Sequence, residues 1–156
     1  GCSSQSNSSG KKIKITSTPT LFFHGGGSSY YAEEHMVRAA EKAGVKRYIM
    51  LSSMLSLDIN SWKKIPSLED YLAAKFFADT YLMDSTNLEY TILQPGSLIE
   101  ETGTGKIQLN VEATDSNPIP DVAKTLAAIL KYPNTIGKVI PMSSGKTPID
   151  DALKEI

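Results

Sequence analysis

A tyrosine and a lysine stand four residues apart in the segment Tyr71-Leu-Ala-Ala-Lys75. Side chains at positions i and i+4 lie on one face of a helix, about 6 Å apart. A lysine ammonium at that distance can stabilise a phenolate, which lets Tyr71 pass a proton to or from a substrate oxygen. The spacing predicts an acid–base pair, and the alternative is a tyrosine and a lysine on a solvated helix face.

Two serines, Ser52 and Ser53, directly follow the apolar segment 48–51, which is predicted to be a strand. Ligand sites in open parallel sheets form at the carboxyl ends of the strands. A serine hydroxyl there can bind the same oxygen that Tyr71 protonates. These four residues together indicate a proton-transfer site at one end of a sheet.

The elements that position these residues alternate between strands and helices. Strands are predicted at 11–16, 20–23, 48–51, 88–93 and 139–142, and helices at 32–43, 67–83, 120–130 and 149–156. Strands separated by helices of this length imply right-handed βαβ crossovers. We therefore expect an α/β fold with a parallel sheet and helices on both faces.

Single residues refine this outline of the fold. Ser67 is the expected N-cap of the second helix, and Asp121 is expected to cap the third. Phe76 and Phe77 are expected to face the core, and Trp62 is expected to anchor a loop.

Composition narrows the possible classes of protein. The chain has 156 residues, 40% of them hydrophobic, and a formal net charge of −1, which fits one globular domain and gives no basic surface for nucleic acid. One cysteine excludes an internal disulfide and a zinc cluster, and no metal site is expected. No apolar run approaches the roughly 20 residues that span a bilayer.

The first residues, GCSSQSNSSG, are rich in serine and predict a flexible tether over residues 1–11, followed by a single domain over 12–156. This start resembles the region around the lipidated cysteine of bacterial lipoproteins. The resemblance implies a lipid anchor on Cys2 and a membrane-anchored, extracytoplasmic protein. The alternative is an ordinary leader with one incidental cysteine.

Five segments resemble the second half of an atypical short-chain dehydrogenase/reductase, in the NmrA-like or sugar-epimerase-like group. They are AAEKAGVKRYIMLSSM, IPSLEDYLAAKFFAD, LEYTILQPGSL, IPDVAKTLAAIL and TIGKVIPM, and they occur in the order of the family. The resemblance covers roughly residues 36–156. It implies an NAD(P)-binding oxidoreductase or epimerase-like protein, a small-molecule substrate and a cytoplasmic location.

Carried over from that family, Tyr71 is the acid/base and Lys75 is its partner, which also contacts the nicotinamide ribose. Ser53, or Ser52 beside it, matches the serine that binds the substrate oxygen. Pro95 and Gly96 match a turn that lies along the nicotinamide.

The family's glycine-rich cofactor loop follows its first strand, and nothing before residue 36 supplies that first half. The only candidate loop contains Gly25 and Gly27, but Tyr30 stands where the third glycine belongs. The same loop can instead match the one after the family's fourth strand, near the adenine. We therefore expect a truncated, partial Rossmann-like sheet. The truncation calls the enzymatic activity of the protein into question, and the exposed sheet edges favour a homo-oligomer.

The first 45 or so residues also resemble the start of α/β-hydrolase-like bacterial lipoproteins, in which an HGGG loop binds an oxyanion. The chain has no G-x-S-x-G segment, and both histidines, His24 and His35, come early. A hydrolase is therefore the weakest hypothesis. The second hypothesis is a lipid-anchored surface protein with a non-catalytic α/β scaffold.

Overall fold

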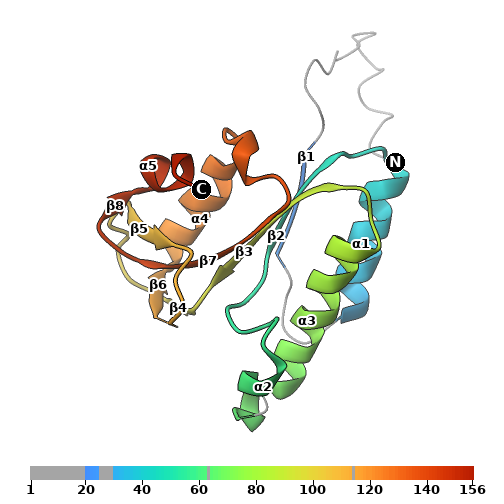
Figure 1. Cartoon of the computed structure of the whole chain (residues 1–156), viewed down its shortest axis with the longest axis horizontal. Helices are drawn as coiled ribbons and strands as arrows, with labels where there is room; N and C mark the ends of the chain where they lie inside the picture. The colour runs from blue at the N-terminus through green and yellow to red at the C-terminus, as the bar shows by residue number, and fades with distance from the viewer. Residues whose placement is uncertain (1–19, 25–29, 63, 114) are drawn as a thin grey trace, which may run out of the picture.

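The structure, a computed structural model, describes residues 20–24, 30–62, 64–113 and 115–156. Its centre is a six-stranded sheet with helices on both faces (Figure 1). Four strands are parallel neighbours in the order β1 (Thr20–His24), β2 (Arg47–Leu51), β3 (Glu89–Pro95) and β7 (Lys138–Ser144). The predicted α/β class, a parallel sheet with flanking helices, is confirmed.

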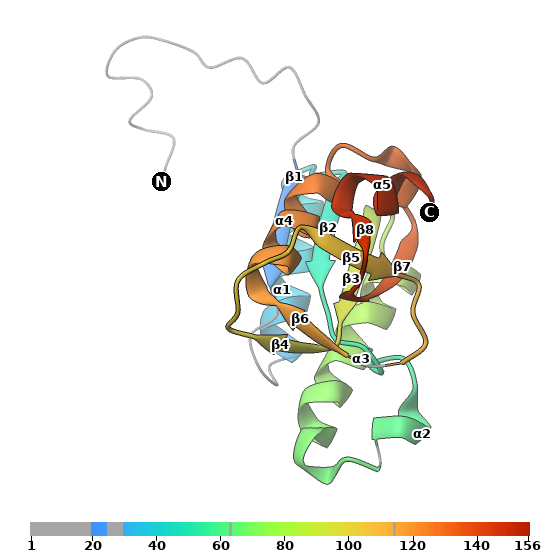
Figure 2. The ribbon, with the colours of Figure 1, turned by 90° about the vertical axis from the view of Figure 1, so that its left-hand side faces the viewer.

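Two short strands extend the sheet beyond β7. Strand β5 (Lys106–Leu109) runs antiparallel to β7 and to β8 (Thr147–Pro148). A separate pair of parallel strands, β4 (Ser97–Ile99) and β6 (Ser116–Pro118), lies below the main sheet (Figure 2). None of these four strands was predicted from the sequence, because two to four residues are too few to show a hydrophobic period.

The helices divide between the two faces of the sheet. On one face lie α1 (Tyr30–Lys42) and α3 (Glu69–Asp84), and on the other lie α4 (Ile119–Ile129) and α5 (Ile149–Lys154) (Figure 1). The short helix α2 (Ile59–Trp62) and a 3-10 turn at Pro66–Leu68 precede α3, and a second 3-10 turn spans Pro133–Thr135. Trp62 is 8% exposed and packs against Phe76, so it is the loop anchor that the sequence predicted.

The alternation of side chains along β2 divides the core into two clusters. Tyr48 and Met50 pack with α1 and α3, whereas Ile49 and Leu51 pack with α4 and α5. Successive residues of a strand point to opposite faces, so a fully buried strand is apolar on both. This double burial fixes the register of β2 and therefore the position of the residues that follow it.

Two predictions about α3 are wrong. Ser67 lies inside the 3-10 turn, and the N-cap of α3 is Leu68, which makes no side-chain capping bond. Phe77 is 54% exposed and Phe76 is half-buried, so neither is a core residue. Consecutive residues of a helix point in different directions, so the three apolar residues Phe76, Phe77 and Ala78 cannot all face the sheet. Of the three, Ala78 is the buried one.

Candidate active site

A small cavity of about 40 Å³ lies at the carboxyl ends of β2 and β3. Five residues that the sequence predicted for the site line it together with two leucines: Ser52, Ser53, Tyr71, Pro95 and Gly96, with Leu51 and Leu98. These residues come from three segments that are distant in the sequence. The fold therefore brings the predicted hydroxyls and the Pro-Gly turn to one place.

Backbone hydrogen bonds hold the two serines at the rim of this cavity. The amide of Ser52 donates to the Leu93 carbonyl at 2.8 Å, and the amide of Met54 donates to the Pro95 carbonyl at 2.9 Å. The pairing of β2 with β3 thus continues past the last residue of β2. Because of this continuation, Ser52 and Ser53 stay next to Pro95.

Tyr71 and Lys75 lie on the same face of α3, as their spacing predicted. The Lys75 ammonium nitrogen is 5.5 Å from the centroid of the Tyr71 ring. Lys75 is 1% exposed, whereas Tyr71 is half-buried and lines the cavity. A cation this close to the ring is attracted by its π-electrons and, electrostatically, favours a negative charge on the phenol.

The sequence analysis missed a buried polar network behind the cavity. Its centre is Asp79, which is 0% exposed and accepts hydrogen bonds from Ser52, Ser56 and Gln94. Asp79 follows Lys75 by four residues, and a second charged residue at that spacing within an apolar segment was the signal that could have revealed it.

Gly96 has a packing reason to be a glycine. A Cβ atom added there would overlap the carbonyl oxygen of Asp115. The amide of Ser97 donates to that same carbonyl at 3.0 Å, which joins the start of β4 to the segment before β6. The Pro95-Gly96 turn is therefore compact, and it lines the cavity.

The prediction that Asp121 caps its own helix is wrong, because the N-cap of α4 is Pro118 and no side chain makes a capping bond. Its carboxylate accepts hydrogen bonds from the amide of Gly105 at 2.8 Å and from the amide of Thr104 at 3.0 Å. A Cβ atom at Gly103 would come within 2.6 Å of the same carboxylate. Asp121, which is 1% exposed, thus fastens the loop before β5 onto the first turn of α4.

Other predicted residues fall outside the part of the chain that the structure describes. Gly25 and Gly27 of the glycine loop, Cys2, the tether over 1–11 and the strand at 11–16 all lie there. Among the described residues, no group of three or more His, Cys, Asp or Glu side chains forms a potential metal site. No helix in the described part of the chain has the length and apolarity to cross a membrane.

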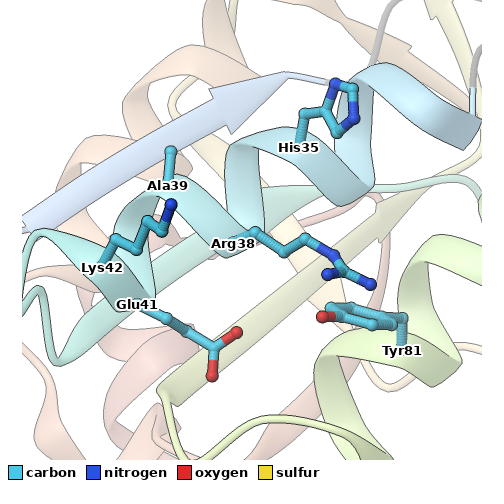
Figure 3. Close-up of a pocket in the computed structure, with 6 residues that line it drawn as sticks. All are labelled: His35, Arg38, Ala39, Glu41, Lys42 and Tyr81. Atoms are coloured by element: carbon cyan, nitrogen blue, oxygen red, sulfur yellow. The ribbon is translucent and has the colours of Figure 1, made fainter.

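A second, wider hollow of about 650 Å³ lies between α1 and α3 and contains none of the predicted site residues (Figure 3). The Arg38 guanidinium lies 5.7 Å from the centroid of the Tyr81 ring and forms an ion pair with Glu34 at 2.9 Å. The positive charge of Arg38 is therefore already paired with Glu34 and with the Tyr81 ring. The residues predicted for the site therefore lie at the smaller cavity and not at this hollow.

Comparisons with known proteins agree with this fold. The family model described as NAD(P)H-binding matches residues 9–133, a range that includes the HGGG segment. The chain is 36% identical over 121 residues to a protein named uncharacterized sugar epimerase YhfK from Bacillus subtilis, covering 77% of this chain and 55% of the relative. It is 38% identical over 128 residues to the Saccharomyces cerevisiae protein YMR090W, covering 78% and 56%.

The solved structure of the oxidoreductase ylbE from Lactococcus lactis superimposes with a TM-score of 0.78 at 48% identity, covering 81% of this chain and 58% of that one. The chain thus spans a little over half the length of each of these relatives. Its matched region extends over most of the sheet and includes the cavity residues. The chain belongs to the NAD(P)H-binding family and has its Rossmann-like, reductase/epimerase-like fold.

Proposed function

We propose that the cavity at the ends of β2 and β3 is the reacting end of an NAD(P)H-dependent reductase or epimerase site, with Tyr71 as the acid/base. The single observation that carries the proposal is that Ser52, Ser53, Tyr71, Pro95 and Gly96 line one cavity. Buried Lys75 lies against the Tyr71 ring. A phenol with hydroxyls and an ammonium beside it can transfer a proton to the oxygen of a carbonyl that is being reduced.

The described residues fit one end of a dinucleotide. A volume of about 40 Å³ holds only a few atoms, whereas whole ligands occupy roughly 300–1,000 Å³. The cavity suits the reacting atoms, and the remainder of a dinucleotide would extend over the carboxyl ends of the parallel strands. A bound NAD(P)H supplies hydride chemistry, and the residues of this chain supply the proton and the positioning.

Each residue has a distinct task in this proposal. Tyr71 donates its phenolic proton to the substrate oxygen in the reductive direction and accepts one in the reverse direction. Lys75 stabilises the phenolate that remains, because its ammonium lies 5.5 Å from the ring centroid. A serine hydroxyl at the end of β2 holds the substrate oxygen in place. Leu98, which is 44% exposed and lines the cavity, presents an apolar surface to the substrate.

Fluorescence titration with NADPH and with NADH tests the proposal. We expect saturable binding of at least one of the two, retained in Tyr71→Phe and weakened in Lys75→Met, which keeps the buried volume. Tyr81→Phe and Lys124→Ala are matched controls, because both residues lie outside the cavity. A chain that is folded by circular dichroism and gives no saturable signal with either cofactor contradicts the proposal.

The second candidate is a lipid-anchored surface protein without catalysis, and the serine-rich start GCSSQSNSSG with its single cysteine supports it. In that case the α/β body is a scaffold, and lipidation of Cys2 places it at a membrane surface. Membrane fractionation of the natural protein with and without Cys2→Ser tests the anchor. Equal partition of both forms into the aqueous fraction counts against the anchor.

The free edge of the sheet supports a further proposal, that two copies pair there. Within the described residues, β1 has β2 as its sole hydrogen-bonded neighbour. An open strand edge carries unpaired backbone groups that can pair with another chain. Sedimentation velocity tests this, with a concentration-dependent dimer as the expected result and a monomer at all concentrations as the contradicting one.

A further inference from the structure

Asp79 is a fully buried acidic residue to which the proposed function gives no task. It follows Lys75 by one helical turn and Tyr71 by two, so the three side chains lie along one face of α3. Its exposed fraction is 0%, and that of Lys75 is 1%. Burying a carboxylate is costly unless hydrogen bonds and an opposite charge compensate for its lost hydration.

Three donors converge on one oxygen of this carboxylate. The hydroxyls of Ser52 and Ser56 each donate to Oδ2 at 2.7 Å, and the Gln94 amide nitrogen donates to it at 3.1 Å. Gln94 also donates to the Ser56 hydroxyl at 2.8 Å, which completes a closed network. The donors belong to β3 and to the segment after β2. Asp79 therefore ties α3 to both strand ends that border the cavity.

The network has a consequence for the two serines at the cavity. A serine hydroxyl has one proton to donate, and Ser52 donates its proton to Asp79. Only the lone pairs of Ser52 are then available to a ligand. Ser53 donates to the neighbouring Met54 carbonyl at 3.2 Å, beyond the usual length for a hydroxyl donor. That weak bond is easily exchanged for one to a substrate oxygen.

We propose that Asp79 is a positioning residue that holds Ser52 as an acceptor and leaves Ser53 as the hydroxyl that donates to the substrate oxygen. This inference rests on the proposed function, because it assigns tasks within the same cavity. Asp79 also lies one helical turn from the buried Lys75 on the same face of α3, and Lys75 in turn contacts the Tyr71 ring. The carboxylate thus acts on the acid–base pair and on the serines from behind the cavity.

A double-mutant cycle on unfolding in urea tests the serine assignment without any cofactor. Asp79→Asn keeps the shape of the side chain and removes its charge. We expect Asp79→Asn and Ser52→Ala to couple by on the order of tenfold in the unfolding equilibrium constant, whereas Asp79→Asn and Ser53→Ala are additive. Ser52→Thr, which retains a hydroxyl, restores the coupling. Equal coupling of both serines to Asp79, or coupling of neither, overturns the proposal.

The charge of Lys75 gives a spectroscopic test that a merely structural role would not affect. In the protein labelled with ¹⁵N-lysine, the protected ammonium signal of Lys75 at pH 7 is identified by its loss in Lys75→Met. We expect Ser56→Ala, which removes one donor outside the cavity, to leave this signal unchanged and Asp79→Asn, which removes the carboxylate one helical turn away, to shift it. Should Asp79→Asn fail to fold, Asp79→Glu replaces it, and the signal is then expected to persist at a shifted position.

The two proposals fail in different ways. An ammonium signal that is unchanged in folded Asp79→Asn overturns the positioning role, whatever the cofactor titration shows. Absence of NADPH and NADH binding overturns the proposed function, while the urea cycle and the ammonium signal still report on Asp79.

Discussion

The ammonium nitrogen of Lys75 lies 5.5 Å from the centroid of the Tyr71 ring, one helical turn away on the same face of α3. Lys75 is buried, whereas Tyr71 reaches the cavity at the ends of β2 and β3. The ammonium of Lys75 thus lies in the protein interior, behind the phenol of Tyr71, which a ligand in the cavity can reach. This arrangement allows the pair to be tested by separate substitutions.

Tyr71→Phe removes the phenolic oxygen and keeps the ring. If Tyr71 transfers the proton, NADPH-dependent reduction of an active carbonyl compound falls by about 10²–10⁴-fold, and cofactor affinity stays within twofold. Steady-state kinetics with a small panel of aldehydes and quinones measures this, with Tyr81→Phe as the control. A Tyr71→Phe protein with undiminished turnover contradicts the acid/base assignment.

Gly96→Ala is expected to destabilise the fold. The added methyl group would overlap the Asp115 carbonyl oxygen, so the β4–β6 pair must shift. Overpacking of this kind costs about 1–3 kcal/mol in the free energy of unfolding. Urea unfolding measures the cost, and Ser97→Ala, at the next and exposed position, is the control. Equal stability of Gly96→Ala and the wild type contradicts the packing seen around this turn.

Asp121→Asn is expected to loosen the loop before β5, because the carboxylate accepts the amides of Thr104 and Gly105. Hydrogen bonds to a charged acceptor contribute about 1.5–3 kcal/mol each, and an amide substitution retains part of this. Hydrogen exchange at those two amides should accelerate. Asp84→Asn, at the exposed end of α3, should leave their exchange unchanged. Slow exchange in Asp121→Asn would show that another group holds the loop.

The hydrogen bond between Tyr132 and Asp150 at the surface predicts the sign of a pH effect on stability. The hydrogen bond from the Tyr132 hydroxyl at 2.7 Å, followed by the contact with Lys131 at 3.2 Å, lowers the pKa of Asp150. A lowered carboxyl pKa contributes stability above the pKa of the unfolded chain, and this contribution is lost as pH falls through the folded pKa. Because the pair is exposed, the effect on stability is small.

Carboxyl ¹³C NMR measures this effect directly. We expect Tyr132→Phe to raise the pKa of Asp150 toward its ordinary value, and by more than Lys131→Met does. The order of the two effects follows from the dominant hydrogen bond. A larger rise in Lys131→Met would show that the charge outweighs the hydroxyl.

The βαβ order and the Tyr71–Lys75 pair could be predicted from local pattern, whereas Pro95 and Gly96 were predicted from the resemblance to a known family. Buried strands such as β2 carry continuous apolar runs, and Tyr71 with Lys75 follows the helical period. The spacing of Asp79 from Lys75 could have indicated a buried charge, but the partners of Asp79 could not be predicted, because they lie 15, 23 and 27 residues away along the chain. The prediction that Phe77 faces the core was wrong for a related reason, since hydrophobicity alone does not say which face of α3 the sheet covers.

The most direct test of the account is to follow the tyrosines by NMR during cofactor addition. In the protein labelled with [ζ-¹³C]tyrosine, Tyr71→Phe assigns the signal of Tyr71, and Tyr132→Phe assigns that of a tyrosine outside the cavity. We predict that NADPH or NADH shifts the Tyr71 signal saturably, with the same affinity as the fluorescence titration, and leaves the Tyr132 signal in place. Saturable binding with an unmoved Tyr71 signal would contradict the placement of the reacting end at this cavity.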